Sequence, residues 1–356
     1  MTDDRRSSRA VVLALVIASW VAPTAQANVW QHASEPGPAA VDDIYAHAME
    51  AGDDAATRAS SHGASIRSIR DLVQQAVDAY KIAAKARPSA GEPWYRIGQL
   101  LHTFYFDCTN DPLGRIPQAS VLCDLGFDRK KAEDTIAAWD EFEKRSPLDP
   151  RLSFVDGEGA EVLFQRAILH TKLIERGSAK EQKLHLEAAA RDYEKIVARI
   201  DSSETSTQFY TMVVGNLAET YMMLDRLDDA VETYREARRH GGRSSTIYGE
   251  AVALDRDERG GEALDLVREL GEEQVRQFHE EVVNGDAFFV PEGEKFYYYA
   301  LLEEAFGHLA DAAKYWQLYI QSGAHPEFQP RAKQHLAALQ AKHIRHDVPH
   351  LDWLDE

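Results

Sequence analysis

The residues of this chain with the most direct chemistry are its two cysteines, Cys108 and Cys123. A cysteine near a histidine can act as a nucleophile, and His102 lies six residues before Cys108. These two positions would not share a helix face, because residues that meet on a helix lie three or four apart. In an exported chain, an even and close pair of cysteines is typical of a disulfide. Fourteen residues lie between the cysteines, and closing such a loop contributes roughly 3 kcal/mol on the chain-entropy model. We therefore expect a Cys108–Cys123 disulfide rather than a catalytic cysteine.

Other candidate motifs lack a residue that their chemistry requires. The run Arg239–Ser244 is rich in glycine but has no Gly-Lys-Ser/Thr, so it is not a phosphate-binding loop. The sequence contains neither a Gly-x-Ser-x-Gly nucleophile motif nor a His-Glu-x-x-His zinc motif. Histidines near the C-terminus could hold zinc or copper at a surface, but Pro349 interrupts any helix there, and a plain polar tail is the simpler interpretation. These histidines are His343, His346 and His350. The sequence thus predicts no catalytic residue, no metal site and no cofactor.

The first residues have the layout of a secretory signal peptide. Arg5, Arg6 and Arg9 precede an apolar run, Ala10–Ala22, and the small residues Ala25 and Ala27 then form a cleavage site. A retained membrane anchor is the alternative, but a bilayer-spanning helix needs about 20 apolar residues. We expect cleavage after Ala27 and a mature protein that is periplasmic or secreted, with no membrane insertion after the signal is removed.

The charge of the chain restricts its partners. The formal net charge is −19, and residues 1–27 carry three Arg and two Asp, so removing their net charge of +1 leaves −20 for the mature protein. Such a charge repels nucleic acid and anionic lipid surfaces, and it favours basic partners. The 44% hydrophobic content is ordinary for a soluble protein.

The elements that would position any site are helices with a fixed pattern of small and large residues. Ala76, Tyr80 and Ala83 share one helix face, and Pro88 ends that helix. In the next helix, Trp94, Ile97, Gly98 and Leu101 share a face at spacings of three, one and three residues. A glycine inside a helix costs about 1 kcal/mol relative to alanine. Gly98 therefore indicates that a neighbouring helix touches the backbone there.

The pattern of a small residue, a large one four later and an apolar one three after that occurs six times. This pattern resembles the second helix of the tetratricopeptide repeat, a helix–turn–helix unit of 34 residues. The run Trp94-x-x-Ile97-Gly98, in the helix before Trp139, resembles the first helix of that unit. The resemblance implies an all-α fold, a right-handed α-solenoid of about six such units. The six matches are Ala76/Tyr80/Ala83, Thr135/Trp139/Phe142, Ala189/Tyr193/Ile196, Ala230/Tyr234/Ala237, Ala263/Val267/Leu270 and Ala312/Trp316/Tyr319.

The spacing of the six matches departs from the family and predicts insertions. Successive matches lie 59, 54, 41, 33 and 49 residues apart, and only the fourth interval fits a 34-residue unit. We expect loop insertions near 103–131, where both cysteines lie, and near 284–294, with a further polar one near 177–185. The expected organisation is a signal peptide at 1–27, a lead-in segment at 28–60, the solenoid at 61–342 and a C-terminal tail at 343–356.

The resemblance also implies a concave groove lined by the first helix of each unit. In this family, residues two, five, nine and twelve places into that helix face the groove. A frame shifted by one residue would place some of them in the core instead. The corresponding positions are Glu92, Tyr95, Gln99 and His102; Glu161, Phe164, Ile168 and Thr171; Met212, Gly215, Glu219 and Met222; Ser245, Tyr248, Val252 and Asp255; and Glu294, Tyr297, Leu301 and Glu304. From this set we predict peptide-binding roles for Tyr95, Gln99, His102, Met212, Glu219, Met222, Tyr248, Tyr297 and Glu304.

Three functions remain open on the sequence. The first is a non-catalytic scaffold of the cell envelope, which binds a peptide or partner protein in an acidic and aromatic groove that suits basic side chains. The second is a structural module that assembles with copies of itself into a homo-oligomer. The third is an enzyme whose chemistry resides in the loop that holds the cysteines. We expect the first.

Overall fold

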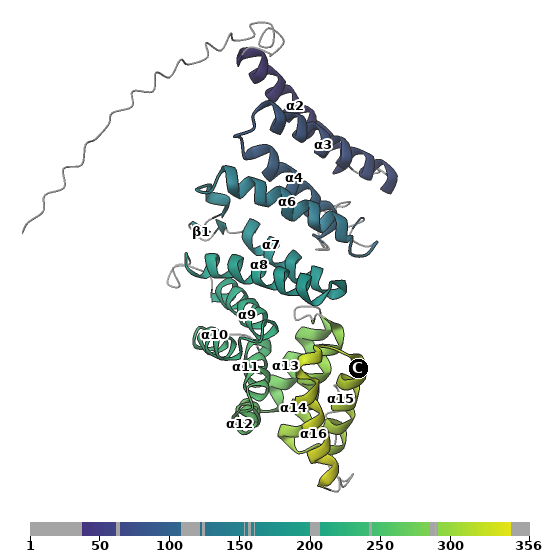
Figure 1. Cartoon of the computed structure of the whole chain (residues 1–356), viewed down its shortest axis with the longest axis vertical. Coiled ribbons are helices and arrows are strands. Elements are labelled where there is room, and N and C mark those ends of the chain that lie inside the picture. The colour runs from purple at the N-terminus through teal and green to yellow at the C-terminus, as the bar shows by residue number, and fades with distance from the viewer. Residues whose placement is uncertain are drawn as a thin grey trace, which may run out of the picture.

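The protein is an all-α array of antiparallel helix pairs, as the computed structural model shows (Figure 1). The structure describes residues 38–61, 65–107, 122, 125–152, 154–155, 158–159, 161–199, 207–241, 244–284, 289 and 291–342. Six pairs follow one another: α2 (Pro38–Ala59) with α3 (Ile66–Ala86), α4 (Glu92–Tyr105) with α6 (Arg129–Arg145), α7 (Glu161–Leu173) with α8 (Ala179–Val197), α9 (Thr207–Met223) with α10 (Leu227–Arg239), α11 (Ser244–Arg256) with α12 (Gly260–Leu270), and α14 (Lys295–Phe306) with α15 (Leu309–Ser322).

Further elements join or cap these pairs. Helix α13 (Glu272–Val283) lies between the fifth and sixth pairs, and α16 (Gln329–Ala341) packs on α15 at the end of the array. Two-residue strands β1 (Phe154–Val155) and β2 (Glu158–Gly159) pair antiparallel, with Phe154 opposite Gly159. Short 3₁₀ turns complete the described chain: η1 (Pro150–Leu152), η2 (Ile174–Arg176), η3 (Glu292–Glu294) and η4 (Pro326–Phe328).

The six predicted signatures fall on the second helix of the six pairs, so the helical-repeat fold is confirmed. The small residue that opens each signature is fully buried, because it lies where two helix backbones approach. The large residue that follows packs between helices and is buried as well. The small residues are Ala76, Thr135, Ala189, Ala230, Ala263 and Ala312, and the large ones are Tyr80, Trp139, Tyr193, Tyr234, Val267 and Trp316.

Two glycines mark the closest approach within a pair. A Cβ atom at Gly98 of α4 would lie 2.4 Å from the ring of Trp139 on α6, as the sequence predicts. A Cβ atom at Gly52 of α2 would lie 2.4 Å from the ring of Tyr80 on α3 in the same way. Helix α2 is therefore the first helix of the first pair. The segment expected as a lead-in at 28–60 thus contains a helix that packs on α3, from Pro38 to Ala59 in its described part.

Local signals explain several helix ends. Ser65 and Asp128 cap α3 and α6 by accepting hydrogen bonds from backbone N–H groups in the first turn. Ser178 and Glu181 form a capping box that begins α8, so most of the polar segment expected as a loop near 177–185 is helical. Gly307 and Gly323 end α14 and α15 in the left-handed conformation, with φ of +85° and +71°.

Several sequence expectations lie outside the described residues. They are the signal peptide at 1–27, the Cys108–Cys123 disulfide, most of the insertion at 103–131 and the histidine tail at 343–356. The insertion expected near 284–294 falls between α13 and α14, and part of it is described. None of the helices in the described ranges has an apolar stretch long enough to cross a membrane.

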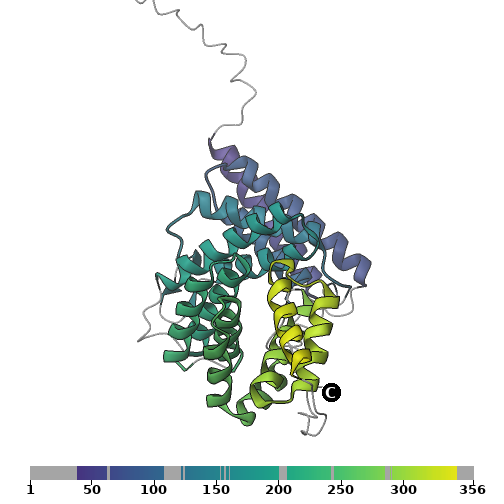
Figure 2. The ribbon, with the colours of Figure 1, turned by 60° about the horizontal axis from the view of Figure 1, so that its bottom comes forward.

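The C-terminal part of the chain turns back toward the middle of the array. In Figure 2 the yellow helices run alongside the green ones, and hydrogen bonds join the two groups. Tyr298 on α14 donates its hydroxyl to Glu219 on α9 over 3.2 Å. Arg331 on α16 donates to Asp255 on α11 over 2.7 Å. This fold-back covers positions that an open solenoid would leave free.

Candidate binding surface on the first helices

The predicted groove positions stay partly open on α4, α7 and α9. We call this region the first-helix surface, and buried contacts beneath it join its three helices. His102 Nε2 on α4 lies 3.1 Å from Gln165 Oε1 on α7, and the Phe164 and Phe209 rings join α7 to α9 with centroids 5.6 Å apart. Its members, each at least partly exposed, are Glu92, Tyr95, Gln99, Glu161, Ile168, Thr171, Met212, Gly215 and Glu219.

Tyr95 lies at one end of this surface, half-buried beneath an arginine. The Arg151 guanidinium lies 3.9 Å from the centroid of the Tyr95 ring, and the Phe142 ring packs nearby at 5.3 Å. Arg151 also donates to Glu92 over 2.8 Å. Burial raises the pKa of Glu92, but hydrogen bonds from Arg151 and Arg96 outweigh it and hold this pKa below its usual value. This end of the surface is therefore ionised and already charge-paired.

His102 does not belong to the surface, which corrects the prediction. Its ring is buried against Trp139, with centroids 5.5 Å apart, and it binds Gln165. Burial lowers the pKa of His102, so the ring is neutral near pH 7. Its neighbour one turn earlier, Gln99, remains partly exposed.

Met212, Gly215 and Glu219 form the part of the surface on α9. Met212 is 36% exposed, a high value for a large apolar side chain. A Cβ atom at Gly215 would have only Thr246 Oγ1 within 4 Å, at 3.5 Å, so the backbone is open there. The Glu219 carboxylate accepts hydroxyl hydrogen bonds from Tyr234 over 2.7 Å and from Tyr298 over 3.2 Å. Desolvation raises the pKa of Glu219, and the surface ends where α14 reaches it.

Four predicted binding residues of the middle and C-terminal pairs are covered by the chain itself, and these predictions were wrong. Met222, Tyr248 and Tyr297 are almost completely inaccessible, and Glu304 retains a tenth of its side-chain surface. Tyr297 packs edge-on against Trp316, with ring centroids 4.7 Å apart, and donates to a buried aspartate over 2.7 Å. The physical reason is the fold-back, since α11 contacts α9, α10, α12, α13 and α14.

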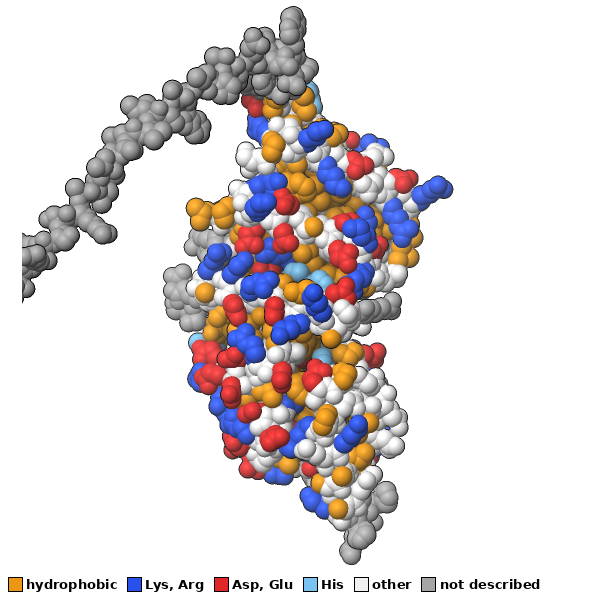
Figure 3. Space-filling view, in the orientation of Figure 1, with side chains coloured by type: hydrophobic (Ala, Val, Ile, Leu, Met, Phe, Trp, Pro, Cys, Tyr) orange, Lys and Arg blue, Asp and Glu red, His pale blue; other side chains and the backbone are white. Residues whose placement is uncertain are grey.

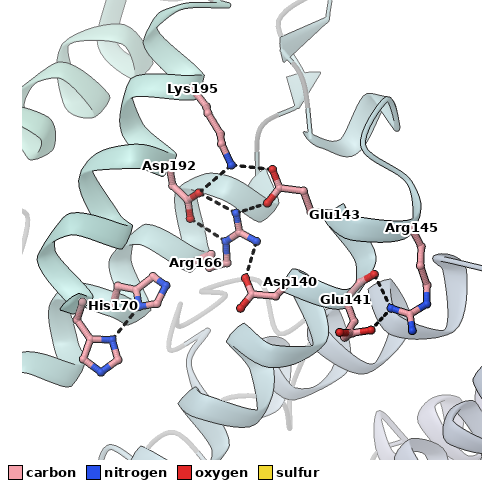
Figure 4. Close-up of polar contacts among 9 residues, drawn as sticks. Asp140, Glu141, Glu143, Arg145, Arg166, His170, Asp192 and Lys195 are labelled. Carbon is pink, nitrogen blue, oxygen red and sulfur yellow. Dashed lines mark hydrogen bonds and ion pairs between the residues drawn. The ribbon is translucent and has the colours of Figure 1, made fainter. Parts of the chain in front are cut away.

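A charged cluster that sequence reasoning missed holds the second and third pairs together (Figure 4). Arg166 on α7 is almost fully buried and donates to carboxylates on both neighbouring helices. Its Nη1 lies 2.9 Å from Asp140 and its Nη2 2.6 Å from Glu143, both on α6. Its Nε and Nη2 each lie 2.7 Å from Asp192 on α8. Lys195 completes the cluster by donating to Glu143 over 2.7 Å.

This cluster bonds α7 to α6 and α8 on the side of α7 that faces away from the first-helix surface. Arg166 and Ile168 lie on opposite sides of α7. They are two residues apart, and because an α-helix turns by about 100° per residue, their side chains point about 200° apart. The available signal was a single arginine inside the apolar run of residues 161–170, EVLFQRAILH. A buried arginine needs carboxylate partners, so that run indicated acidic residues on the helices around it.

Comparisons with known proteins add little to this geometry. No protein-family model and no curated protein matches the chain. Among solved structures, the crystal structure of MamA protein aligns with 70% of this chain and 100% of its own, at 16% identity and a TM-score of 0.40. The crystal structure of yeast Tom70 aligns with 84% of this chain and 64% of its own, at 14% identity and a TM-score of 0.28. Identities and TM-scores this low say nothing about what the chain binds.

The surface chemistry around the site is mixed in sign. In the view of Figure 3, acidic and basic side chains are interspersed over the middle of the molecule. Many of them form exposed pairs one helical turn apart, such as Lys130 with Asp134 at 2.7 Å. Such pairs contribute little to stability. Within the described residues, no three His, Cys, Asp or Glu side chains are arranged to hold a metal ion.

Two histidines next to the charged cluster should make the protein sensitive to acid. His170 on α7 and His185 on α8 face each other with their Nδ1 atoms 2.9 Å apart, so one ring donates to the other. Burial disfavours a charge on His170, and the positive charges of protonated His185 and of Arg166 disfavour it further. Together they lower the pKa of His170 to about 3. In the unfolded chain its pKa is about 6.5.

Between pH of about 6.5 and about 3, His170 is therefore protonated in the unfolded state and neutral in the folded state. Stability is lost as the pH falls below about 6.5, and the loss for this group reaches about 2 kcal/mol between pH 7.5 and pH 5. Urea unfolding at both pH values should show a smaller loss in a His170→Leu variant than in the wild type. An identical loss in both proteins would contradict the assignment.

Proposed function

We propose that this protein is an exported, non-catalytic repeat protein of the tetratricopeptide type that binds a partner protein through its first-helix surface. The observation that carries the proposal is the difference between the two halves of the predicted groove. Nine of the twelve positions on α4, α7 and α9 keep part of their surface, and the three that do not are His102, Phe164 and Met222. Six of the eight positions at η3, α11 and α14 are buried, and only Ser245 and Glu304 keep part of their surface. A partner therefore meets the N-terminal half.

The composition of the open half favours an extended segment with apolar and basic side chains. Met212 offers a polarizable apolar contact, and the open backbone at Gly215 allows a chain to approach closely. Glu161 is exposed near Tyr95, so an incoming lysine or arginine would find an unburied carboxylate beside an aromatic ring. The net charge of −19 supports a basic partner and disfavours nucleic acid. The proposed location in the cell envelope or outside the cell rests on the signal-like residues 1–27.

Capture from a native envelope fraction tests the site with a matched control. The test variant combines Met212→Arg with Glu161→Lys on the first helices. The control variant combines Leu184→Arg on α8 with Glu269→Lys on α12, two exposed residues of second helices. All three proteins should melt alike. We expect a partner that the wild type and the control variant retain and the test variant loses.

Two results would contradict the proposal. Equal recovery by all three proteins would show that the partner binds elsewhere. Recovery of nothing except further copies of the chain would favour the self-assembling module, and light scattering would then show a stable homo-oligomer at low micromolar concentration.

A further inference from the structure

The last helix of the array carries positive charge in an acidic protein. Residues 329–342, which contain α16, include Arg331, Lys333 and Lys342 but no Asp or Glu, while the chain as a whole has a net charge of −19. The buried positions of α16 are Ala332, His335 and Leu339, and they recur at helical spacing. Helix α16 is thus a cationic helix that packs one face against the rest of the chain.

This face meets two carboxylates at predicted groove positions. Asp255 on α11 accepts from Arg331 Nη2 over 2.7 Å and from His335 Nε2 over 2.9 Å. Glu304 on α14 accepts from His335 Nδ1 over 2.8 Å. Arg331 and His335 lie four residues apart, which places both on one face of α16. Because both His335 nitrogens face carboxylates, the pKa of His335 rises to about 9 despite its burial, and the ring is a cation at neutral pH.

The rest of the chain contributes two aromatic side chains that donate uncharged hydrogen bonds to the same two carboxylates. Tyr297 donates its hydroxyl to Asp255 over 2.7 Å, and Trp316 Nε1 donates to Glu304 over 3.1 Å. The Trp316 ring also stacks on His335, with centroids 4.6 Å apart. The cations that contact Asp255 and Glu304 in the described contacts come from α16. Without α16, this surface would present two acidic groups that lack a positive partner, beside two aromatic rings.

We propose that Asp255, Tyr297, Glu304 and Trp316 form a second binding site, for a cationic helix with basic residues four apart, and that α16 is its occupant in cis. A partner helix of the same chemistry binds by displacing α16. This site is separate from the first-helix surface, so either proposal can fail while the other stands.

The connection between α15 and α16 suits such a displacement. Gly323 and His325 both have positive φ, at +71° and +38°. A histidine in this region is strained, because its Cβ crowds the backbone. A few residues that absorb a backbone change at an element's end are the usual form of a hinge. His325 also lies 3.9 Å from Glu294 in η3 and 3.4 Å from Glu327 within the connection itself.

A labelled peptide of residues 326–342 is the probe, and fluorescence anisotropy with the full-length chain is the measurement. The release variant, Arg331→Ala with His335→Ala, removes the anchors of α16 but keeps the site. The control variant, Lys333→Ala, removes an exposed positive charge from the same helix. We expect the release variant to bind the peptide at least about tenfold more tightly than the wild type or the control, since a larger fraction of molecules is open.

A third variant tests whether peptide binding requires the Asp255 carboxylate. Adding Asp255→Asn to the release variant should remove the gain, and a peptide that itself lacks Arg331 and His335 should not bind. Equal peptide affinity for the release variant and the wild type would overturn the proposal. Binding that Asp255→Asn leaves unchanged would overturn it as well.

Hydrogen exchange on the wild type provides the test if the release variant does not fold. Excess peptide should speed exchange in α16 and leave α2–α10 unchanged, because the peptide takes the place of α16 alone. Unchanged exchange in α16 at peptide concentrations that saturate any binding would refute displacement.

Discussion

Replacing Arg166 by leucine is expected to lower the free energy of unfolding by about 3–5 kcal/mol. Arg166 is only 3% exposed, and it is bonded to Asp140, Glu143 and Asp192. Asp192 is as deeply buried as the arginine. The variant would leave this carboxylate without the guanidinium, next to Lys195 only at 3.8 Å. An uncompensated buried charge is the main cost.

Urea unfolding followed by circular dichroism measures the effect, and an exposed arginine is the matched control. Arg276 on α13 also contacts two carboxylates, Glu273 and Glu280, but about half of its side chain is exposed. Arg276→Leu should change the unfolding free energy by no more than about 1 kcal/mol. Adding Asp192→Ala to Arg166→Leu should restore part of the loss, because it removes the orphaned charge. Equal effects of Arg166→Leu and Arg276→Leu would refute the buried-charge explanation.

Replacing Trp316 by alanine is expected to cost about 3–5 kcal/mol, as large truncations in a core do. Trp316 is 0% exposed and packs edge-on against Tyr297 while it stacks on His335. It also donates to Glu304 over 3.1 Å. The cavity would therefore lie between α14, α15 and α16, and one polar contact would be lost with it.

Trp94→Ala is the internal comparison for this prediction. Trp94 opens the predicted first-helix signature of α4, and the sequence pattern alone assigns it the same packing role. In the structure it remains partly exposed, with the Arg145 guanidinium 5.2 Å from its ring centroid. Its loss should cost less than half as much as the loss of Trp316. A larger effect at Trp94 than at Trp316 would contradict the observed burial.

The fold could be predicted from the sequence because its signal is local and repeated. A small residue, a large one and an apolar one at fixed offsets specify how two adjacent helices pack, and all six instances lie on second helices. The pairing of α2 with α3 was not predicted, because the buried positions of α2 lack the large residues of the signature; they are Ala48, Gly52, Ala55 and Ala59. The close contact of Gly52 with Tyr80 shows the same packing without that signal.

The candidate site could be predicted only in part, because its exposure depends on contacts between distant segments. The spacing correctly places Met212 on an accessible face of α9. The same spacing places Tyr297 in the groove, where the structure buries it. The difference arises from pairings such as Asp255 with His335, which are 80 residues apart. Helix periodicity shows which side of a helix a residue occupies, but not which later helix covers that side.

The bonds between α11 and α16 and between α9 and α14 also affect how the array can change in length. In an array where each pair contacts only its neighbours, a pair can be added or removed if one junction re-forms. The N-terminal pairs meet this condition closely. In the C-terminal half, Tyr298 reaches back to Glu219, and His335 reaches back to Asp255. Inserting or deleting a pair there would separate both partners at once. We therefore expect that a pair can be added or removed at the N-terminal end without breaking these two hydrogen bonds, whereas a change among the last pairs would break them.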